Sequence, residues 1–593
     1  MMKKSSIKLS TLKQVWGYIK HYKLLLALSI LFAILIVALS LFIPVIIGYA
    51  IDIIGSDTPI DFEKLSTPLL YVACMAVAVG ILQWLMNVIN NKITYNVTRD
   101  VRNQAFDKIE HLPLKSIDSR PHGEFVSKVV ADVDQLSEGL LMGFSQLFTG
   151  ILTIIGTLVI LFVIDYRIAI AVAVLTPLSL FIANFIAKRT YSLFNKQSKA
   201  RADQTAVVDE MIGNLKVVKA FSHEDEALEE FDATNKKLQK TSVKAIFFSS
   251  LVNPTTRFVN ALVYATVALV GAMIVISPNA STADSALSVG VLASVLSYAT
   301  QYAKPFNEIS GVVSELQNAF ACADRVFELI NEPSEEPDAS DAVVLSNVND
   351  DICINDVKFS YTEEQKLIEN LSLTVKPGQR VAIVGPTGCG KTTIINLLMR
   401  FYDIQDGSIC VDGHDIRGVT RASLRESYGM VLQETWIRNA SIRDNIAISK
   451  PDATDEEIIT AAKLSHAHSF IKRLPNGYDT VVSENSSLLS QGQKQLLCIA
   501  RIMLSLPPML ILDEATSSID TRTEIKIQEA FTAMMKGRTS FIVAHRLSTI
   551  QEADIILVMN KGKIIEQGTH DELIEKHGFY YNLYNSQFEG TEK

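Results

Sequence analysis

Long apolar stretches alternate with charged stretches over the first 330 residues of the chain. A helix needs ~20 mostly apolar residues to cross ~30 Å of hydrocarbon, and each apolar stretch is about that long. The first is too long for a signal peptide, and no small-residue cleavage site follows a short apolar core. The pattern predicts a polytopic α-helical membrane domain with six transmembrane helices, at residues 24–50, 68–90, 140–164, 168–187, 256–276 and 288–310.

Basic residues predict the orientation of these helices. Six lysines precede the first helix, whereas the connection 51–66 carries four carboxylates and one lysine. The connection 277–287 has no Lys or Arg. Because cytoplasmic connections are enriched in Lys and Arg, we expect the N-terminus in the cytosol. With an even number of helices the C-terminus is expected there too, in a multi-pass membrane protein.

Two long connections of the membrane domain have a helical pattern. Residues 91–115 and 188–250 contain few Gly or Pro and carry apolar residues at helical spacing. We therefore expect the membrane helices to continue into the cytosol. Short turns near Ser116–Glu124 and Gly213–Glu224 would then contact a second domain. The alternative is a pair of solvated helical hairpins.

Composition marks the remaining boundaries. Residues 1–23 place apolar side chains among lysines, which predicts a helix lying on the inner leaflet. The segment from Asn331 to Asp341 is acidic and holds two prolines, so it is expected to be an extended, flexible linker. The predicted parts are the interfacial helix 1–23, the membrane domain 24–330, the linker 331–347 and a second domain 348–593.

The second domain contains a phosphate-binding loop. An apolar run of buried-strand type, Arg380–Val384, leads into residues 385–392, which fit G-x-x-x-x-G-K-[ST] completely. Glycines let backbone N–H groups approach phosphates, and the following helix offers its positive N-terminal end. Lys391 is expected to reach the β- and γ-phosphates of ATP, and Thr392 to bind Mg²⁺. The nucleotide-contacting segment is Gly385, Pro386, Thr387, Gly388, Cys389, Gly390, Lys391, Thr392 and Thr393.

A second strand ends in two carboxylates. The apolar run Leu510–Leu512 leads into Asp513 and Glu514. Asp513 can hold the metal ion through water, and Glu514 can act on the attacking water. Together with the phosphate loop, this pair predicts an α/β P-loop nucleotide-binding domain that hydrolyses ATP.

Charge and cysteines exclude some other functions. The net charge of −9 argues against nucleic acid as the main partner, because phosphate backbones need a basic face. The six cysteines form no CxxC pair and match no zinc pattern. They are expected to be thiols in a reducing compartment.

These motifs resemble those of ATP-binding cassette (ABC) exporters in the fused half-transporter form, from about residue 10 to residue 585. The resemblance implies a role for each matching position. Tyr361 would stack on adenine, Gln433 would contact Mg²⁺, and His545 would contact the γ-phosphate and share catalysis with Glu514. Residues 210–221 resemble the element by which such exporters touch a cassette. The signature that acts on the partner's nucleotide would be Ser490, Gln491, Gly492 and Gln493, and the dimer-interface loop would include Ser517 and Asp520.

The signature departs from the usual pattern at Gln491, where the family carries glycine. A side chain at a position where backbone must approach phosphate should impair that contact. The chain then resembles the subunit with the intact glutamate in heterodimeric bacterial multidrug exporters, which favours a second half-transporter chain as partner. The alternative is a homodimer in which Gln491 is tolerated.

Polar residues inside the predicted membrane helices are candidates for a substrate cavity, since they avoid lipid. Each could instead hold helices together. The resemblance implies ATP-driven export of amphipathic drug-like or lipid-like compounds across a bacterial cytoplasmic membrane by alternating access. A homodimeric lipid or peptide exporter and an ATP-gated channel are the alternatives. The candidates are Asn87, Asn184, Arg257, Asn260, Tyr264, Tyr298, Gln301 and Tyr302.

Overall fold

The computed structural model describes residues 9–55, 62–276, 288–346, 348–349, 351–362, 367–432, 435–484, 488–513, 519–543 and 547–588, without some of the side chains within 178–195, 252–253, 307–314, 547–548 and 586–588. The chain forms two compact units. The helical unit comprises Met1–Leu112 and Arg120–Ser334, and the α/β unit comprises Pro113–Ser119 and Glu335–Lys593. The short segment Pro113–Ser119 therefore packs with the α/β unit although it interrupts the helical unit in sequence.

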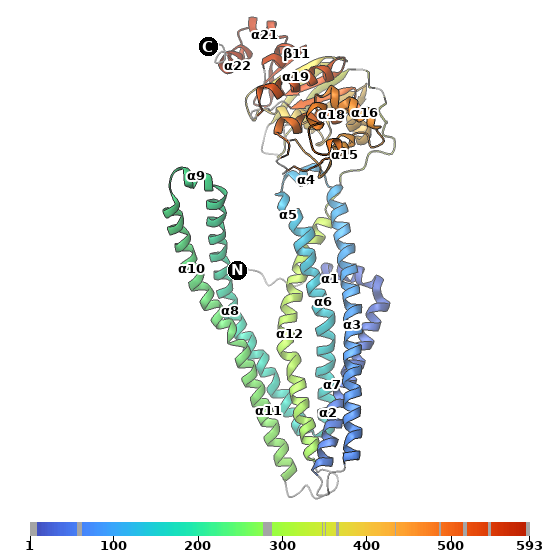
Figure 1. Ribbon diagram of the computed structural model, residues 1–593, viewed down its shortest axis with the longest axis vertical. Helices are drawn as coiled ribbons and strands as arrows, with labels where there is room; N and C mark the ends of the chain where they lie inside the picture. The colour runs from blue at the N-terminus through green and yellow to red at the C-terminus, as the bar shows by residue number, and fades with distance from the viewer. Residues whose placement is uncertain are drawn as a thin grey trace. The chain divides into compact units, whose positions relative to one another are not determined.

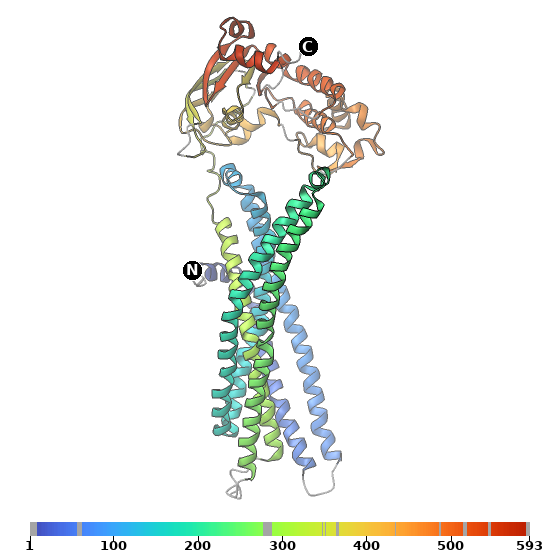
Figure 2. The same ribbon diagram turned by 90° about the vertical axis from the view of Figure 1, so that its left-hand side faces the viewer.

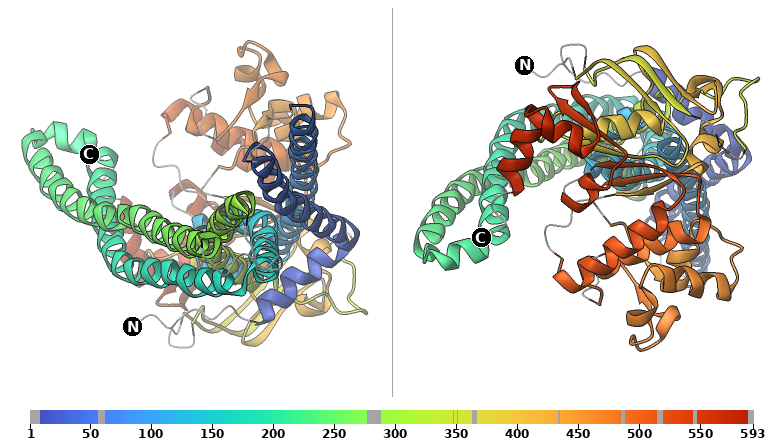
Figure 3. Two further views of the ribbon diagram at one scale, coloured as in Figure 1. Left: turned by 90° about the horizontal axis from the view of Figure 1, so that it is seen from below. Right: turned by 90° about the horizontal axis from the view of Figure 1, so that it is seen from above.

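Long helices make up the described part of the helical unit (Figures 1 and 3). Their order follows the apolar pattern of the sequence. The elements are α1 (Leu9–Ile19), η1 (Lys20–Tyr22), α2 (Lys23–Ile54), α3 (Phe62–Glu110), α5 (His122–Ser127), η2 (Lys128–Asp132), α6 (Val133–Met142), η3 (Gly143–Leu147), α7 (Phe148–Ile164), α8 (Tyr166–Gly213), α9 (Leu215–Ala220), α10 (Glu224–Ser250), α11 (Val252–Ile276) and α12 (Val289–Ile330).

Four helical stretches among the described residues are long and apolar enough to cross a membrane. They are Leu9–Ile54, Phe62–Glu110, His122–Ile164 and Glu224–Ile276. The predicted span 168–187 lies in α8, whose apolar helix Tyr166–Pro177 is shorter, and the span 288–310 lies in α12. The helical membrane domain agrees with the sequence pattern, and the count of six helices stays a prediction.

The predicted helical connections are confirmed. Helix α3 continues to Glu110, and α8 continues to Gly213 before α9 turns the chain back into α10. Helices α8 and α10 lie side by side (Figure 2). The Lys237 ammonium lies 2.7 Å from the Asp203 carboxylate, and the Gln204 amide donates to Asn235 at 3.0 Å. These contacts between α8 and α10 stabilise the helical hairpin that the two helices form.

Helix α1 has the expected two faces. Val15 and Ile19 are buried against the helical unit, whereas Leu9 and Trp16 are exposed. An exposed apolar face beside lysines suits a helix at a membrane surface.

Helices α2 and α12 meet at a very close crossing. A Cβ at Gly290 would lie 1.9 Å from the carbonyl oxygen of Gly48, so this crossing excludes side chains. Beside it, the Asp52 carboxylate accepts from the Ser288 hydroxyl at 2.6 Å and from the Gly290 N–H at 2.7 Å. Small residues allow the approach, and the carboxylate binds the two helices at this end.

The α/β unit contains two main sheets. A six-stranded sheet has the order β12-β11-β3-β10-β9-β6, parallel except for β12, and an antiparallel sheet has the order β2-β1-β4-β5. The strands are β1 (Ile352–Phe359), β2 (Ile368–Val375), β3 (Arg380–Val384), β4 (Asp406–Val411), β5 (His414–Asp415), β6 (Tyr428–Val431), β7 (Ala440–Ser441), β8 (Val481–Val482), β9 (Met509–Asp513), β10 (Thr539–Val543), β11 (Ile555–Asn560) and β12 (Lys563–Gly568).

The six-stranded sheet is covered on both faces, by helices that include α18 and α19 on one and by α13 with the antiparallel sheet on the other. Alternate residues of β9 enter two different cores: Leu510 and Leu512 enter one, and Met509 and Ile511 the other. The helices are α4 (Leu114–Asp118), α13 (Lys391–Leu398), η5 (Ile416–Gly418), α14 (Arg421–Glu426), α15 (Ile442–Ala447), α16 (Asp455–Leu464), α17 (His468–Ile471), η6 (Gly477–Asp479), α18 (Gln491–Ser505), α19 (Thr521–Met535), α20 (Leu547–Gln551), α21 (His570–Glu575) and α22 (Phe579–Phe588).

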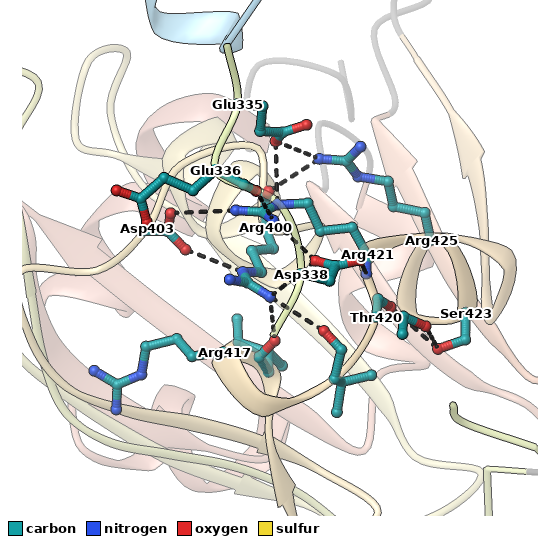
Figure 4. A network of polar contacts seen from close by, with 12 residues as sticks. Glu335, Glu336, Asp338, Arg400, Asp403, Arg417, Thr420, Arg421, Ser423 and Arg425 are labelled. Carbon is teal, nitrogen blue, oxygen red and sulfur yellow. Dashed lines mark hydrogen bonds and ion pairs between the residues drawn. The ribbon is translucent and has the colours of Figure 1, made fainter. Parts of the chain in front are cut away.

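The acidic linker is extended, as predicted, but part of it is bound to the α/β unit (Figure 4). The Arg421 guanidinium, which is buried, donates to Asp338 at 2.9 Å and to the Glu336 carbonyl at 2.7 Å. Arg425 lies 3.3 Å from Glu335. The expected flexibility is therefore wrong for these residues, because a buried guanidinium requires partners and the linker's acids supply them.

Candidate functional site

The phosphate loop has the backbone that its sequence predicts. Gly388 and Gly390 have φ of +79° and +102°, which disfavour residues with a Cβ. A Cβ at Gly385 would lie 2.3 Å from the Met559 carbonyl oxygen. The Lys391 ammonium donates to the carbonyls of Gly385 at 2.8 Å and Pro386 at 3.1 Å. The lysine thus lies across the loop, at the first turn of α13.

The remaining residues of the loop support this arrangement. Thr392 is exposed at the start of α13, whereas Thr393 is buried. Cys389 is buried, and burial raises the pKa of its thiol, so it stays neutral beside a phosphate site. A loop with backbone N–H groups, a lysine and an open threonine suits a triphosphate and its metal ion.

Sheet register brings Asp513 to the same edge as this loop. Asp513 pairs with Val543, which pairs in turn with Ile383, two residues before Gly385. Because all three strands are parallel, their carboxyl ends share one edge of the sheet, where α/β proteins bind ligands. Asp513 is buried there. The predicted residues Gln433, Glu514, Ser517 and His545 lie outside the described residues.

Tyr361, the expected adenine-stacking residue, lies beside α13. Its hydroxyl accepts from Asn396 at 3.1 Å and lies 3.4 Å from the Thr393 hydroxyl. Its ring meets the rings of Phe359 and Tyr402 edge-on, with centroids 5.0 Å away in each case. The ring is half-buried, so part of it stays accessible next to the helix that follows the phosphate loop.

The signature forms the start of α18. The Ser490 hydroxyl accepts from the Gln493 N–H at 3.3 Å, and the Gln493 side chain accepts from the Ser490 N–H at 2.9 Å. This is a capping box, which fixes the N-terminus of the helix. Gly492 packs closely on the same unit, since a Cβ there would lie 2.5 Å from Thr523.

The side chain of Gln491 bonds within its own α/β unit. Its amide donates to the Thr435 hydroxyl at 3.1 Å, and Thr435 is buried. Thr435 lies two residues after Gln433, the residue expected to contact Mg²⁺. The amide therefore joins the signature to the segment that follows Gln433.

The interface loop and the first connection have defined anchors. Asp520 caps α19 by accepting from the Thr523 N–H at 2.9 Å, and this bond lowers the pKa of the Asp520 carboxyl.

On α4, Asp118 accepts from the Tyr402 hydroxyl at 2.6 Å, and Leu114 packs on the core of the α/β unit. The part of the first predicted tip within Pro113–Ser119 thus belongs to the α/β unit, whereas the contact predicted near Gly213–Glu224 stays a prediction.

Comparisons with known proteins agree with this architecture. The family model "ABC transporter transmembrane region" matches residues 26–305, and the model "ABC transporter" matches residues 368–517. A Bacillus subtilis (strain 168) protein described as "Uncharacterized ABC transporter ATP-binding protein YfiC" is 38% identical over 585 residues, which cover 98% of this chain and 94% of that protein. The chain belongs to the ABC transporter family.

Two further relatives of this ABC transporter are a protein named for its cargo and a solved exporter structure. A Mycobacterium bovis (strain ATCC BAA-935 / AF2122/97) protein named "Fatty acid ABC transporter ATP-binding/permease protein" is 39% identical over 524 residues, covering 88% of this chain and 82% of that protein. The solved structure of a bacterial Atm1-family ABC exporter with ATP bound is similar with a TM-score of 0.76 and 28% identity, covering 94% and 98% of the two chains. The chain is thus an ATP-hydrolysing transporter with an exporter fold.

The predicted cavity residues of this ABC transporter lie in different environments. Asn260 and Tyr264 on α11, with Gln301 on α12, line a cavity of about 430 Å³. Tyr298 and Tyr302 are buried in helix packing, where Tyr298 donates to the Leu41 carbonyl. Neither tyrosine lines this cavity, and their place in a substrate cavity stays a prediction. Asn87 and Arg257 are exposed and do not line this cavity, and the Asn184 side chain is outside the described residues.

Three residues of interest were missed from sequence. Asn90 is buried and joins three helices, accepting from Ser29 at 2.6 Å and donating to Ser145 at 3.3 Å. Thr435 gave no signal before its contact with Gln491 was known. Lys304 lines the cavity of α11 and α12, and its charge within the predicted span 288–310 was a visible signal.

Proposed function

We propose that this ABC transporter exports amphipathic drug-like or lipid-like compounds across the bacterial cytoplasmic membrane, with six membrane helices and both termini in the cytosol. The complete phosphate loop on the same sheet edge as Asp513 carries the proposal, because it can bind and position a nucleotide. The exporter fold of the solved relative supports transport out of the cell, and the name of the fatty acid transporter supports an amphipathic cargo.

In the proposed cycle, the phosphate loop and its neighbours bind and hydrolyse ATP, and the signature contacts the nucleotide of a second chain. The phosphate loop and Tyr361 bind ATP, Thr392, Gln433 and Asp513 hold Mg²⁺, and Glu514 with His545 activates the attacking water. The signature of a second chain closes over this nucleotide. Closure draws the intracellular ends of the long helices together and opens the cavity outward, and hydrolysis resets the inward state.

The partner is proposed to be a different half-transporter, because Gln491 replaces the usual glycine. A second candidate, a homodimer, is favoured by one observation. The Gln491 amide bonds to Thr435 within its own unit, so its side chain need not obstruct the partner's nucleotide. Both candidates keep the same hydrolytic residues.

Turnover of the chain purified alone tests the proposal. We expect ATP hydrolysis in lipid nanodiscs that Glu514→Gln abolishes, if identical chains form a working dimer. If the partner is a different chain, the preparation binds ATP without turnover, and activity appears when that chain is co-expressed. Turnover that survives Glu514→Gln in either preparation would contradict the proposed role of Glu514.

A further inference from the structure

The cavity between α11 and α12 has a polar end, where Lys304 is the charged residue among the described lining residues. Three of its eight lining residues are small, Ala261, Ala299 and Ala303, and their short side chains leave space open. Lys304 brings an ammonium to the lining, and the described residues that line the cavity include no carboxylate. A ligand in this cavity would therefore meet a positive charge and no negative one.

Two polar groups at this end, Lys304 and the side-chain oxygen of Asn260, have no partner among the described residues. Among the described residues, Lys304 forms no ion pair or hydrogen bond, and Glu308, one turn further along α12, does not pair with it. The side-chain oxygen of Asn260 is buried without a hydrogen-bond partner. Charged and polar groups inside a membrane domain are costly unless they have partners, and such groups mark ligand sites.

The depth of these residues follows from the helices. Lys304 lies fifteen residues after the start of α12, or about 22 Å along its axis, and Asn260 lies sixteen residues before the end of α11, or about 24 Å. With the orientation proposed above, both lie in the cytosolic third of a ~30 Å hydrocarbon layer. The apolar part of the cavity then extends from this polar end toward the membrane centre.

We propose that this cavity binds amphiphiles with an anionic head group, a carboxylate or a phosphate, which Lys304 recognises while Asn260 and Gln301 hydrogen-bond to the head. The acyl or aryl part lies along the alanine-lined wall. This assignment rests on the proposed export function and narrows its cargo from amphipathic compounds in general to anionic ones. A cationic amphiphile would meet the ammonium of Lys304 without a compensating carboxylate.

Direct binding to the full-length chain in phosphatidylcholine nanodiscs tests the assignment. The probes are fluorescent sixteen-carbon chains that differ in head group: carboxylate, phosphate, alcohol and trimethylammonium. We expect the two anions to bind at least about tenfold more tightly than the others, because a hydrogen bond to a charged group contributes about 1.5–3 kcal/mol. The carboxylate and phosphate probes show which anion is preferred.

Variants assign this preference to one side chain. Lys304→Gln should remove the preference for anions, Lys304→Arg should retain it, and Lys92→Gln, at an exposed lysine of α3, should leave it unchanged. Equal affinities of all four probes, or an unchanged preference in Lys304→Gln, would overturn the assignment and leave Lys304 as a lysine that extends to the lipid head groups. ATP hydrolysis that depends on Glu514 is measured in the same nanodiscs, so failure of the export function is recognised separately.

Discussion

In the proposed cycle the phosphate loop and the signature of this transporter both contact ATP, but they differ in their agreement with the family pattern. Every defining position of the loop is present, and its glycines adopt the backbone angles that the motif requires. The signature keeps its serine cap and its closely packed Gly492, yet carries Gln491 where glycine is usual. In the proposed cycle, the phosphate loop therefore keeps the full family pattern for its own nucleotide, while the signature that would contact a partner's nucleotide carries one substitution.

The difference teaches that a substitution is judged by where its side chain goes. From sequence, Gln491 predicts an obstruction in front of a phosphate. In the structure its amide donates to Thr435 at 3.1 Å. The backbone N–H groups at the start of α18 remain arranged by the Ser490 capping box.

Removing the catalytic carboxylate is expected to have the largest effect. Glu514→Gln should lower ATP turnover by about 10²- to 10⁴-fold, the usual contribution of a general base, with ATP affinity unchanged. Steady-state hydrolysis and nucleotide binding in nanodiscs measure the two quantities. ATP turnover close to that of the unmodified chain would contradict the assignment of Glu514 as the general base for the nucleotide at the phosphate loop.

A methyl group in the signature should have the next largest effect. In Gly492→Ala the new Cβ would lie 2.5 Å from Thr523 and 2.9 Å from Ile519, so α18 or these two side chains must shift. We expect a loss of about 1–3 kcal/mol in stability and a strong decrease in turnover, with ATP still bound by the phosphate loop.

The matched control for this variant is Gly418→Ala, where a Cβ would meet nothing within 4 Å. Thermal unfolding and hydrolysis are measured for both variants. Equal behaviour of the two variants would contradict the close packing of Gly492 on α19.

Tyr402→Phe should have a moderate effect. It removes the hydroxyl that donates to Asp118 at 2.6 Å, a bond that contributes about 1 kcal/mol or somewhat more because the acceptor is charged. Burial and this carboxylate raise the pKa of Tyr402, so the hydroxyl stays protonated at neutral pH. Since α4 is the tip of the first connection, we expect ATP turnover to persist while transport per ATP decreases. An unchanged ratio of transport to hydrolysis would argue against a role for this contact.

The smallest effect is expected at Gln491 itself. A neutral side-chain hydrogen bond contributes about 0.5–1.5 kcal/mol, so Gln491→Gly and Thr435→Val should each change turnover by no more than about tenfold. The double variant should resemble either single variant, because both remove the same bond. Additive effects would show that the two residues act separately.

Much of the fold could be predicted because the patterns are long and periodic. Apolar stretches predicted the helical domain, and helical spacing in 91–115 and 188–250 predicted α3, α8 and α10 beyond the membrane. The phosphate loop was predictable because its backbone geometry requires glycines at fixed positions, and those glycines can be read from the sequence.

Contacts between distant residues could not be predicted in the same way. Nothing in the sequence near Arg421 shows that it would be buried and bind Asp338. Tyr302 and Gln301 are neighbours in sequence, but one is buried in packing and the other lines the cavity, because helix rotation decides which face each takes. The partner of Gln491, 56 positions away, was equally inaccessible.

ATP-driven transport by the reconstituted protein tests the central claim most directly. Proteoliposomes with the α/β unit facing outward should accumulate a fluorescent amphiphile when ATP and Mg²⁺ are added, with the partner chain present if the chain alone is silent. The account predicts accumulation that Glu514→Gln and removal of Mg²⁺ both abolish. ATP-dependent ion conductance without accumulation, or accumulation that persists in Glu514→Gln, would contradict an exporter driven by hydrolysis at this site.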